Sequence, residues 1–418
     1  MDIEKTALVV EDRNTSDDTT VSPEESVVVP DDRGLIQDPL KQRKIKEIEV
    51  ACERRDTTQL RRLAESAGGF LSDHVRRRAW PVLLGIQNGT AARLSNKEQR
   101  VAEKEESRWQ DLPPHKDEDQ VDLDVKRSFV YYPQDQSDAQ LERNRAELSS
   151  LIVQVLRRYP YLGYFQGYHD VCQVFLLVLG LDAGAPAVSR LSVLRIRDFM
   201  LPTLAASIAQ LRLLPDIIRQ ASPKLWRHLE GVEPFYALSG TLTMFAHNIE
   251  RYHDIARLFD VLLAREPAFS LYLFAQIVID RQDEILDIEE PDILHVILGK
   301  VPPNMDLDRL IVDSVALFDR FPPEKLPAWR SISNASVLKT ARDVDHSDQQ
   351  TMASGRLYFE QQVKDMHWDE MKVKALKALW SYRRPARAMG MTVAVGLVAF
   401  YLRRNPTALN YVFALFSR

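Results

Sequence analysis

Apolar residues recur at helical spacing along most of the chain. After Asp138 they stand mostly three or four positions apart, at Leu141, Leu148, Leu151, Ile152, Val155 and Leu156. This spacing predicts an amphipathic helix with one buried face. Asp138 is a residue type that often caps helix N-termini, and we predict it as the N-cap. Residues 42–52 have the same spacing and predict an earlier helix.

The pattern predicts a series of further helices, with proline residues at many of the joints. They cover residues 169–179, 187–200, 204–214, 235–250, 254–264, 268–287, 291–299 and 306–320. Phe269–Ile279 is apolar nearly all round, which indicates a helix buried between others. The alternation of period two that is typical of strands is not convincing anywhere. We therefore predict an all-α fold with helices stacked in layers.

Composition divides the chain into four parts. Residues 1–38 lack aromatic side chains and are rich in acidic and hydroxyl residues. Such a segment buries too little apolar area to offset its ordering entropy, so we predict a disordered acidic tail. Residues 39–330 form the predicted helical domain, and residues 331–384 a linker with a basic amphipathic segment. Residues 385–418 form a predicted C-terminal membrane anchor.

The overall composition argues against several classes of protein, namely nucleic-acid-binding, disulfide-rich, metal-binding and nucleotide-binding proteins. Apolar residues make up 45% of the 418 positions, enough for a sizeable core, and the net charge of -5 does not favour nucleic acid. Two distant cysteines, Cys52 and Cys172, do not suggest a disulfide framework and favour a reducing compartment. His247 and His253 are six positions apart and share no helix face, so we expect no metal site. The glycine-rich phosphate loop is missing, so we expect no bound nucleotide or other cofactor.

Two short polar segments carry the candidate chemistry. The segment Val121–Ser128 contains Arg127, and the segment Tyr164–Asp170 contains Gln166. An arginine neutralises charge on a transferring phosphoryl group, and a glutamine amide orients the attacking water. Taken singly, each residue is better explained as a surface arginine or a helix-start amide.

A third segment, Arg76–Gly85, combines three arginines with a Trp-Pro-Val-Leu-Leu-Gly sequence. Alone it is explained as a basic helix start followed by buried apolar residues. In this order, the three segments resemble the TBC domain, a family of GTPase-activating proteins for Rab GTPases. The resemblance covers about Asp56–Leu326 and implies an all-helical domain. It also implies that Arg127 enters the nucleotide pocket of the GTPase, while Gln166 positions water in place of the GTPase's own glutamine.

The resemblance implies supporting roles for four neighbouring residues. Asp124 would orient the arginine loop, and Tyr164 would pack beneath Gln166 or contact the GTPase. Gly167 would allow close backbone approach, and Asp170 would anchor its loop. Each of the four is equally compatible with a purely structural role. GTP and Mg²⁺ would belong to the partner, so the chain would act on a partner's GTP hydrolysis instead of hydrolysing its own nucleotide.

The C-terminal region contains fifteen uncharged residues, 388–402, flanked by arginines. As a helix this stretch spans about 22 Å, short of a bilayer core of about 27–30 Å, and snorkelling arginines cover part of the difference. Basic residues are denser before it than after it, which predicts a cytosolic catalytic domain. Within the TBC family, the motifs resemble a membrane-anchored subgroup. This resemblance implies an endoplasmic reticulum or early Golgi membrane and a role in traffic between them. A buried helix, or a hairpin completed by residues 407–416, remains an alternative to a single span.

Two other functions remain open from the sequence. One is a TBC-like scaffold that binds a GTPase without accelerating hydrolysis. The other is a membrane-tethered helical adaptor whose polar segments are capping loops.

Overall fold

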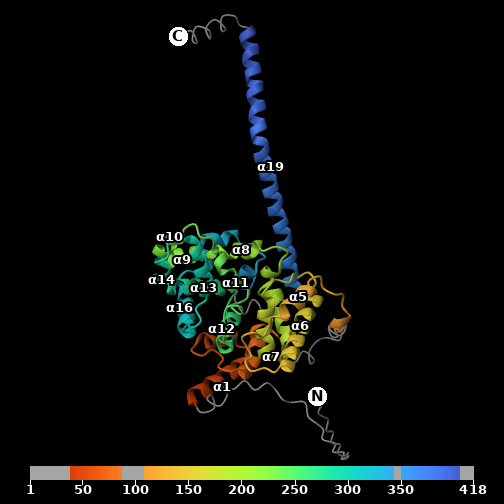
Figure 1. Cartoon of the computed structure of the whole chain (residues 1–418), viewed down its shortest axis with the longest axis vertical. Helices are drawn as coiled ribbons and strands as arrows, with labels where there is room; N and C mark the ends of the chain where they lie inside the picture. The colour runs from red at the N-terminus through yellow and green to blue at the C-terminus, as the bar shows by residue number, and fades with distance from the viewer. Residues whose placement is uncertain (1–37, 87–107, 343–349, 405–418) are drawn as a thin grey trace, which may run out of the picture. The chain divides into compact units, whose positions relative to one another are not determined.

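The computed structural model describes residues 38–86, 108–342 and 350–404 (Figure 1). The predicted acidic tail, apart from Asp38, and the apolar stretch 407–416 lie outside the described residues. Residues 43–418 cluster as one unit and residues 1–42 as another.

The described residues form α-helices and short 3₁₀ helices, with no β-strand among them (Figure 1). The first half contains α1 (Pro39–Arg54), α2 (Thr57–Glu65), α3 (Asp73–Leu83), η2 (Trp109–Asp111), α5 (Glu118–Val125), α6 (Asp138–Arg158), α7 (Tyr168–Leu194) and η3 (Arg197–Met200). Then follow α8 (Ala205–Leu211), α9 (Leu213–Ala221), α10 (Pro223–His228), η4 (Pro234–Ala237), α11 (Leu238–Leu242), α12 (Tyr252–Ala264), α13 (Phe269–Asp280) and α14 (Gln282–Leu286). The last are α15 (Pro291–Gly299), α16 (Leu307–Arg320), η5 (Pro323–Lys325), η6 (Pro327–Ser331), α17 (Val337–Thr340) and α19 (Met352–Arg404). The all-helical prediction is confirmed.

Helix α6 buries the stripe that its spacing predicts, and it packs beside α7 (Figure 1). Its N-cap differs from the prediction by one residue. The Ser137 hydroxyl accepts from the backbone N–H of Gln140 at 3.2 Å, whereas Asp138 already lies in the first turn. An acidic residue in the first turn still complements the helix dipole.

Helix α7 is a core helix in two parts. Gly180 has a non-helical backbone, with φ +72° and ψ 177°, and this break separates the two helices that the pattern predicts. Among the described residues, α7 is the one helix long and apolar enough to cross a membrane. Because 61% of its most apolar window is buried by other helices, it belongs to the core.

The predicted helix over residues 235–250 is wrong in its second half. Helix α11 ends at Leu242, and Met244 and Phe245 have left-handed φ values of 50° and 66°. Phe245 is 1% exposed and stacks on Phe274 with ring centroids 6.1 Å apart. Apolar spacing alone does not reveal this turn, because the same side chains are buried by a different backbone path. The turn places His247 beside the start of α7.

The Arg76–Gly85 segment is explained by a buried carboxylate on α12. Asp260 is fully buried and accepts from Arg76 Nε at 3.0 Å and from Trp80 Nε1 at 2.9 Å. It also accepts from the backbone N–H of Phe70 at 2.9 Å. This one carboxylate therefore fixes α3, and the chain entering it, against α12.

The range predicted as a linker contains residues of the core. Phe359, in α19, is 5% exposed and packs edge-on against Tyr161 at a centroid distance of 5.0 Å. Gln362 Nε2 donates to Asp198 Oδ1 at 2.9 Å, and Asp198 also accepts from Gln210 at 2.7 Å. The first turns of α19 thus complete the helical body.

Ending the chain after residue 330 is expected to lower its free energy of unfolding by at least about 3 kcal/mol. The truncation removes Phe359 from the core, and losing a buried phenylalanine side chain costs about 3–5 kcal/mol. It also leaves Asp198 with fewer donors. The measurement is urea denaturation of chains ending after residues 330 and 377. Equal stability of the two chains would show that α19 contributes nothing to the domain.

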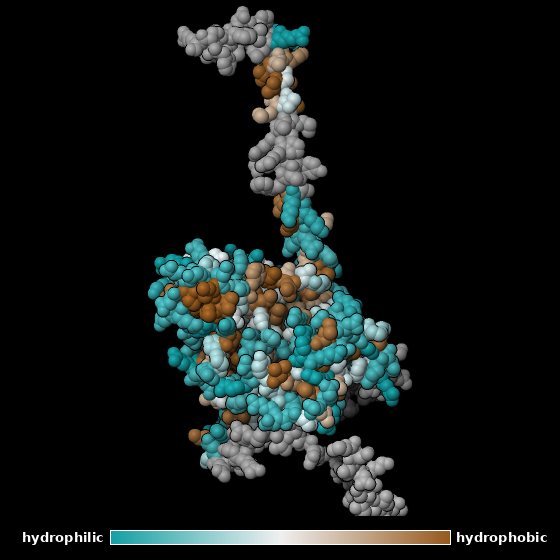
Figure 2. Space-filling view, in the orientation of Figure 1, coloured by the Kyte–Doolittle hydropathy of each residue, from teal (hydrophilic) through white to brown (hydrophobic). Residues whose placement is uncertain are grey.

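Beyond these turns, α19 continues as a helix to Arg404. Its large apolar side chains within Met391–Tyr401 are 57–72% exposed, and Figure 2 shows apolar residues gathered near this end of the helix. This apolar segment is shorter than the length that a full span requires.

Candidate functional site

Arg127 lies in the turn that follows α5. Its side chain is 68% exposed, and its Nη2 donates to Asp124 Oδ1 at 2.7 Å. Helix α5 is itself held to α6 by Glu118, which pairs with Arg157 at 2.6 and 2.7 Å. The guanidinium group is therefore supported from beneath while its outer face is open to solvent.

Asp124 is the buried partner of this arginine, with 1% exposure. Besides Arg127, it accepts from Gln120 Nε2 at 3.0 Å and from the Tyr164 hydroxyl at 2.8 Å. A buried carboxylate needs such donors to remain charged. Burial first, and then the Asp124 carboxylate, raise the pKa of the Tyr164 hydroxyl, so this hydroxyl keeps its proton and donates.

The chain leaving Arg127 is fixed by α7. Phe129 has a left-handed φ of 64°, which is strained for a bulky residue. Its backbone N–H donates to Gln173 Oε1 at 3.0 Å, and Gln173 Nε2 donates to the carbonyl of Tyr132 at 3.2 Å. One buried amide on α7 thus holds both ends of the segment after Arg127.

Gln166 is exposed on the loop that enters α7. The next residue, Gly167, has φ +95°, and a Cβ there would lie 2.6 Å from Thr243 Cγ2. Only glycine fits this turn, because both the backbone angle and the space exclude a side chain. The same loop is tied to the N-cap residue of α5, since the backbone N–H of Tyr164 donates to Asp117 Oδ2 at 3.0 Å.

The two polar segments therefore meet at the Tyr164–Asp124 hydrogen bond, which joins residues forty positions apart in the sequence. Arg127, Asp124, Tyr164 and Asp170 belong to one connected set of polar contacts. Gln166 stands on the same loop as Tyr164 and is exposed.

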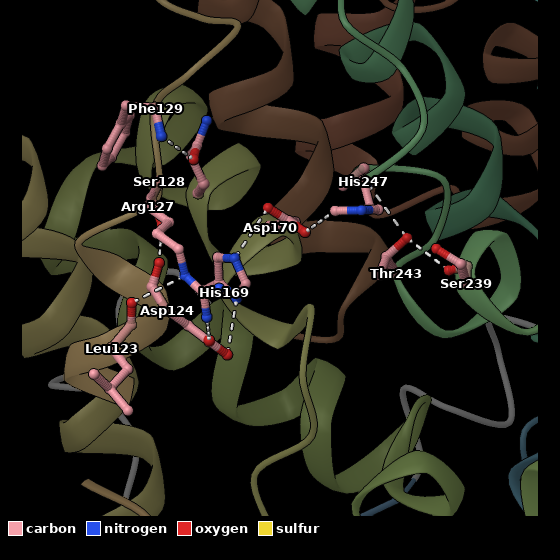
Figure 3. Close-up of polar contacts among 12 residues, drawn as sticks. Leu123, Asp124, Arg127, Ser128, Phe129, His169, Asp170, Ser239, Thr243 and His247 are labelled. Atoms are coloured by element: carbon pink, nitrogen blue, oxygen red, sulfur yellow. Dashed lines mark hydrogen bonds and ion pairs between the residues drawn. The ribbon is translucent and has the colours of Figure 1, made fainter. Parts of the chain in front are cut away.

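Two histidines extend this set, and sequence reasoning missed both (Figure 3). His169 Nδ1 lies 3.1 Å from the Tyr164 hydroxyl, and His169 Nε2 lies 3.3 Å from Asp170 Oδ1. His247 Nδ1 lies 3.0 Å from Asp170 Oδ2. Burial lowers the pKa of His169, whereas the hydrogen bond to Asp170 raises the pKa of His247. The sequence places His169 inside the Tyr164–Asp170 segment with no predicted role, and it offers His247 only as a rejected metal ligand.

The surface around Arg127 is partly apolar. Leu123 is 55% exposed, Val130 74% and Tyr131 47%. A cavity of about 230 Å³ lies elsewhere, lined by Trp226 and Tyr236 among others, and contains none of the candidate residues. The arrangement is thus an exposed guanidinium and an exposed amide on two joined loops, suited to a ligand carried by another molecule.

Comparisons with known proteins show the family and the fold. Residues 73–286 match the model of the Rab-GTPase-TBC domain. TBC1 domain family member 20 of Bos taurus is 32% identical over 368 residues, covering 86% of this chain and 88% of that protein. The GTPase-activating protein gyp10 of Schizosaccharomyces pombe is 30% identical over 333 residues, covering 78% and 85%. The crystal structure of the Ypt/Rab-GAP domain of Gyp1p superposes with a TM-score of 0.52 at 16% identity, covering 63% of this chain and 93% of that one, which shows the fold.

Proposed function

The chain belongs to the Rab-GTPase-TBC family, and we propose that it accelerates GTP hydrolysis by supplying Arg127 and Gln166 in trans. Arg127 stabilises the charge that develops on the γ-phosphoryl group, and Gln166 orients the attacking water. Arginines supplied in trans raise GTPase turnover by about 10³–10⁵-fold. This corresponds to about 4–7 kcal/mol of barrier.

The observation that carries this proposal is the hydrogen bond between Tyr164 and Asp124. It fixes the loop that bears Gln166 relative to the carboxylate that holds Arg127. Two exposed groups that act on one phosphoryl group need such a fixed relation, because misplacement by about 1 Å costs about 10²-fold in rate. In a helical adaptor, where the two segments only cap helices, the two loops would not need a fixed position relative to each other.

GTP and Mg²⁺ belong, in this proposal, to the partner Rab GTPase. The apolar residues Leu123, Val130 and Tyr131 flank the arginine and provide contact area for that protein. The chain supplies the part of the catalytic site that the partner lacks.

The test is single-turnover GTP hydrolysis with a panel of Rab GTPases, run beside a binding assay on the GTP-loaded proteins. A catalytic activator speeds hydrolysis by at least one Rab. A scaffold binds GTP-loaded Rab without speeding hydrolysis, and an adaptor of another kind does neither. Either of these two results would overturn the catalytic proposal.

We further propose that the C-terminal end anchors the protein in an endoplasmic reticulum or early Golgi membrane, with the catalytic domain in the cytosol. The exposed apolar side chains within Met391–Tyr401 support this, because water is an unfavourable environment for a continuous apolar surface. Arg403 and Arg404 follow the stretch and suit the polar boundary of a bilayer. The client is then a Rab GTPase of endoplasmic reticulum-to-Golgi traffic, an assignment that rests on the resemblance of the motifs to the membrane-anchored subgroup.

Deleting residues 385–418 is expected to move the protein from the membrane fraction to the soluble fraction, with GTPase activation retained. Deleting only residues 405–418 leaves the stretch 388–402 in place and is expected to keep the protein on membranes. Carbonate extraction and flotation of both variants measure the effect. Release by the shorter deletion would favour a hairpin over a single span, and retention of the longer deletion would contradict the anchor.

A further inference from the structure

The Tyr164 hydroxyl has two polar neighbours but one proton. Asp124 Oδ2 lies 2.8 Å away and His169 Nδ1 lies 3.1 Å away. A tyrosine hydroxyl donates one hydrogen bond and accepts others. It therefore donates to one of these neighbours and accepts from the other, or one contact is left without a proton.

The charged and closer acceptor takes the hydroxyl proton. Hydrogen bonds to a carboxylate are about twice as strong as those between neutral groups, and Asp124 is buried. The hydrogen bond between Tyr164 and His169 then requires that His169 Nδ1 carry a hydrogen and donate to the Tyr164 oxygen. This assignment gives one directed chain of donors, which runs from His169 to Tyr164 to Asp124 and meets Arg127 on the other carboxylate oxygen.

The second ring nitrogen makes no hydrogen bond to any residue that the structure describes. His169 Nε2 lies 3.3 Å from Asp170 Oδ1 without the alignment of a hydrogen bond, so this contact does not require a proton on Nε2, and Asp170 Oδ2 has His247 Nδ1 at 3.0 Å as its partner. The groups facing His169 are Asp170, Asp124, His247, Arg127 and Tyr164. Burial is the largest of these influences and lowers the pKa of His169, so the ring is neutral at neutral pH.

We propose that His169, as the tautomer protonated on Nδ1, is a positioning residue that holds the arginine loop and the glutamine loop in one fixed arrangement. It acts through Tyr164 and Asp124, since its own side chain is only 12% exposed. The inference rests on the proposed function and deepens it. Preorganisation of this kind affects the chemical step more than binding.

The kinetic test uses two substitutions at one position. His169→Asn keeps an N–H donor close to the place of Nδ1, whereas His169→Leu removes the donor at similar volume. His169→Leu is expected to lower kcat of the accelerated hydrolysis by about 10-fold with KM within about 3-fold of wild type. His169→Asn is expected to retain kcat within about 3-fold of wild type, since it preserves the contact with Tyr164.

A cycle with Tyr164→Phe checks that His169 acts through this hydroxyl. The double variant His169→Leu with Tyr164→Phe is expected to lose no more activity than Tyr164→Phe alone, because both changes break the same chain. His253→Leu, at an exposed histidine on α12, serves as the control and leaves kcat unchanged. Equal kcat for His169→Leu and wild type, or equal loss in His169→Asn and His169→Leu, would overturn the inference.

A readout without a GTPase separates this inference from the proposed function. Imidazole ¹⁵N NMR of the full chain in detergent, with the signal assigned by its loss in His169→Asn, reports which nitrogen is protonated. A proton on Nδ1 at pH 7.5 is expected, and a proton on Nε2 overturns the donor chain whatever the GTPase assays show. A proton on Nδ1 in a protein that activates no Rab would leave the donor chain in place and overturn its catalytic consequence together with the proposed function.

Discussion

Arg127→Ala is expected to lower the accelerated rate of GTP hydrolysis by about 10³–10⁵-fold and to leave binding of the GTP-loaded Rab nearly unchanged. The guanidinium acts where charge develops in the transition state, so its loss appears in kcat and much less in affinity. The side chain is 68% exposed, so its removal is expected to leave the fold intact. Asp124 keeps Gln120 and Tyr164 as donors.

The matched variants are Arg127→Lys and Lys126→Ala. Lysine lacks the planar fork of donors, so Arg127→Lys is expected to lose most of the activity although it retains the charge. Lys126 is the exposed neighbour in the same turn, and its removal is expected to change kcat by less than about 2-fold. Single-turnover hydrolysis and a binding titration with a GTP analogue measure both quantities. Full activity of Arg127→Ala would place the arginine outside the site.

Gln166→Ala is expected to lower kcat of the accelerated GTP hydrolysis by about 10²–10³-fold. This is the usual cost of losing one oriented polar group in a reaction site. A double variant with Arg127→Ala is expected to lose less than the product of the two single losses, because the groups act as one unit. Independent, fully multiplicative losses would argue against a shared site.

Asp260→Ala is expected to lower the free energy of unfolding by about 3–5 kcal/mol, the cost of removing one partner of a buried ion pair. Asp260 is fully buried and pairs with Arg76, itself 2% exposed, at 3.0 Å. The change also leaves Trp80 Nε1 and the backbone N–H of Phe70 without their acceptor. Each such buried donor left unpaired costs about 1–3 kcal/mol.

Urea denaturation of the chain ending after residue 377 measures this loss. Asp260→Asn keeps the volume and one acceptor, so it is expected to cost less than Asp260→Ala. Asp283→Ala removes an exposed carboxylate from α14 and is expected to change stability by less than about 0.5 kcal/mol. An Asp260→Ala protein as stable as the control would mean that α3 is held to α12 by apolar packing alone.

Most helices of this protein, and the faces that they bury, can be predicted because local residue spacing encodes them. Leu148 and Leu151 lie on the same face of α6 whatever that helix packs against. The break between the two parts of α7 coincides with Gly180, where the backbone leaves helical geometry. Boundaries that depend on distant contacts were not predictable. Residues 243–250 leave the helix because Phe245 packs against Phe274 from another element, and Phe359 joins the core through Tyr161.

The sequence by itself determined the helical class and the family and singled out Arg127 and Gln166 as candidates, because these follow from periodicity and from the order of short segments. Only the tertiary structure decided how the two are related in space. The Tyr164–Asp124 contact, the placement of His169 and the arrival of His247 beside Asp170 all join residues from separate elements. Such contacts depend on how α5, α7 and the turn after α11 pack together, and no local pattern in the chain records that packing.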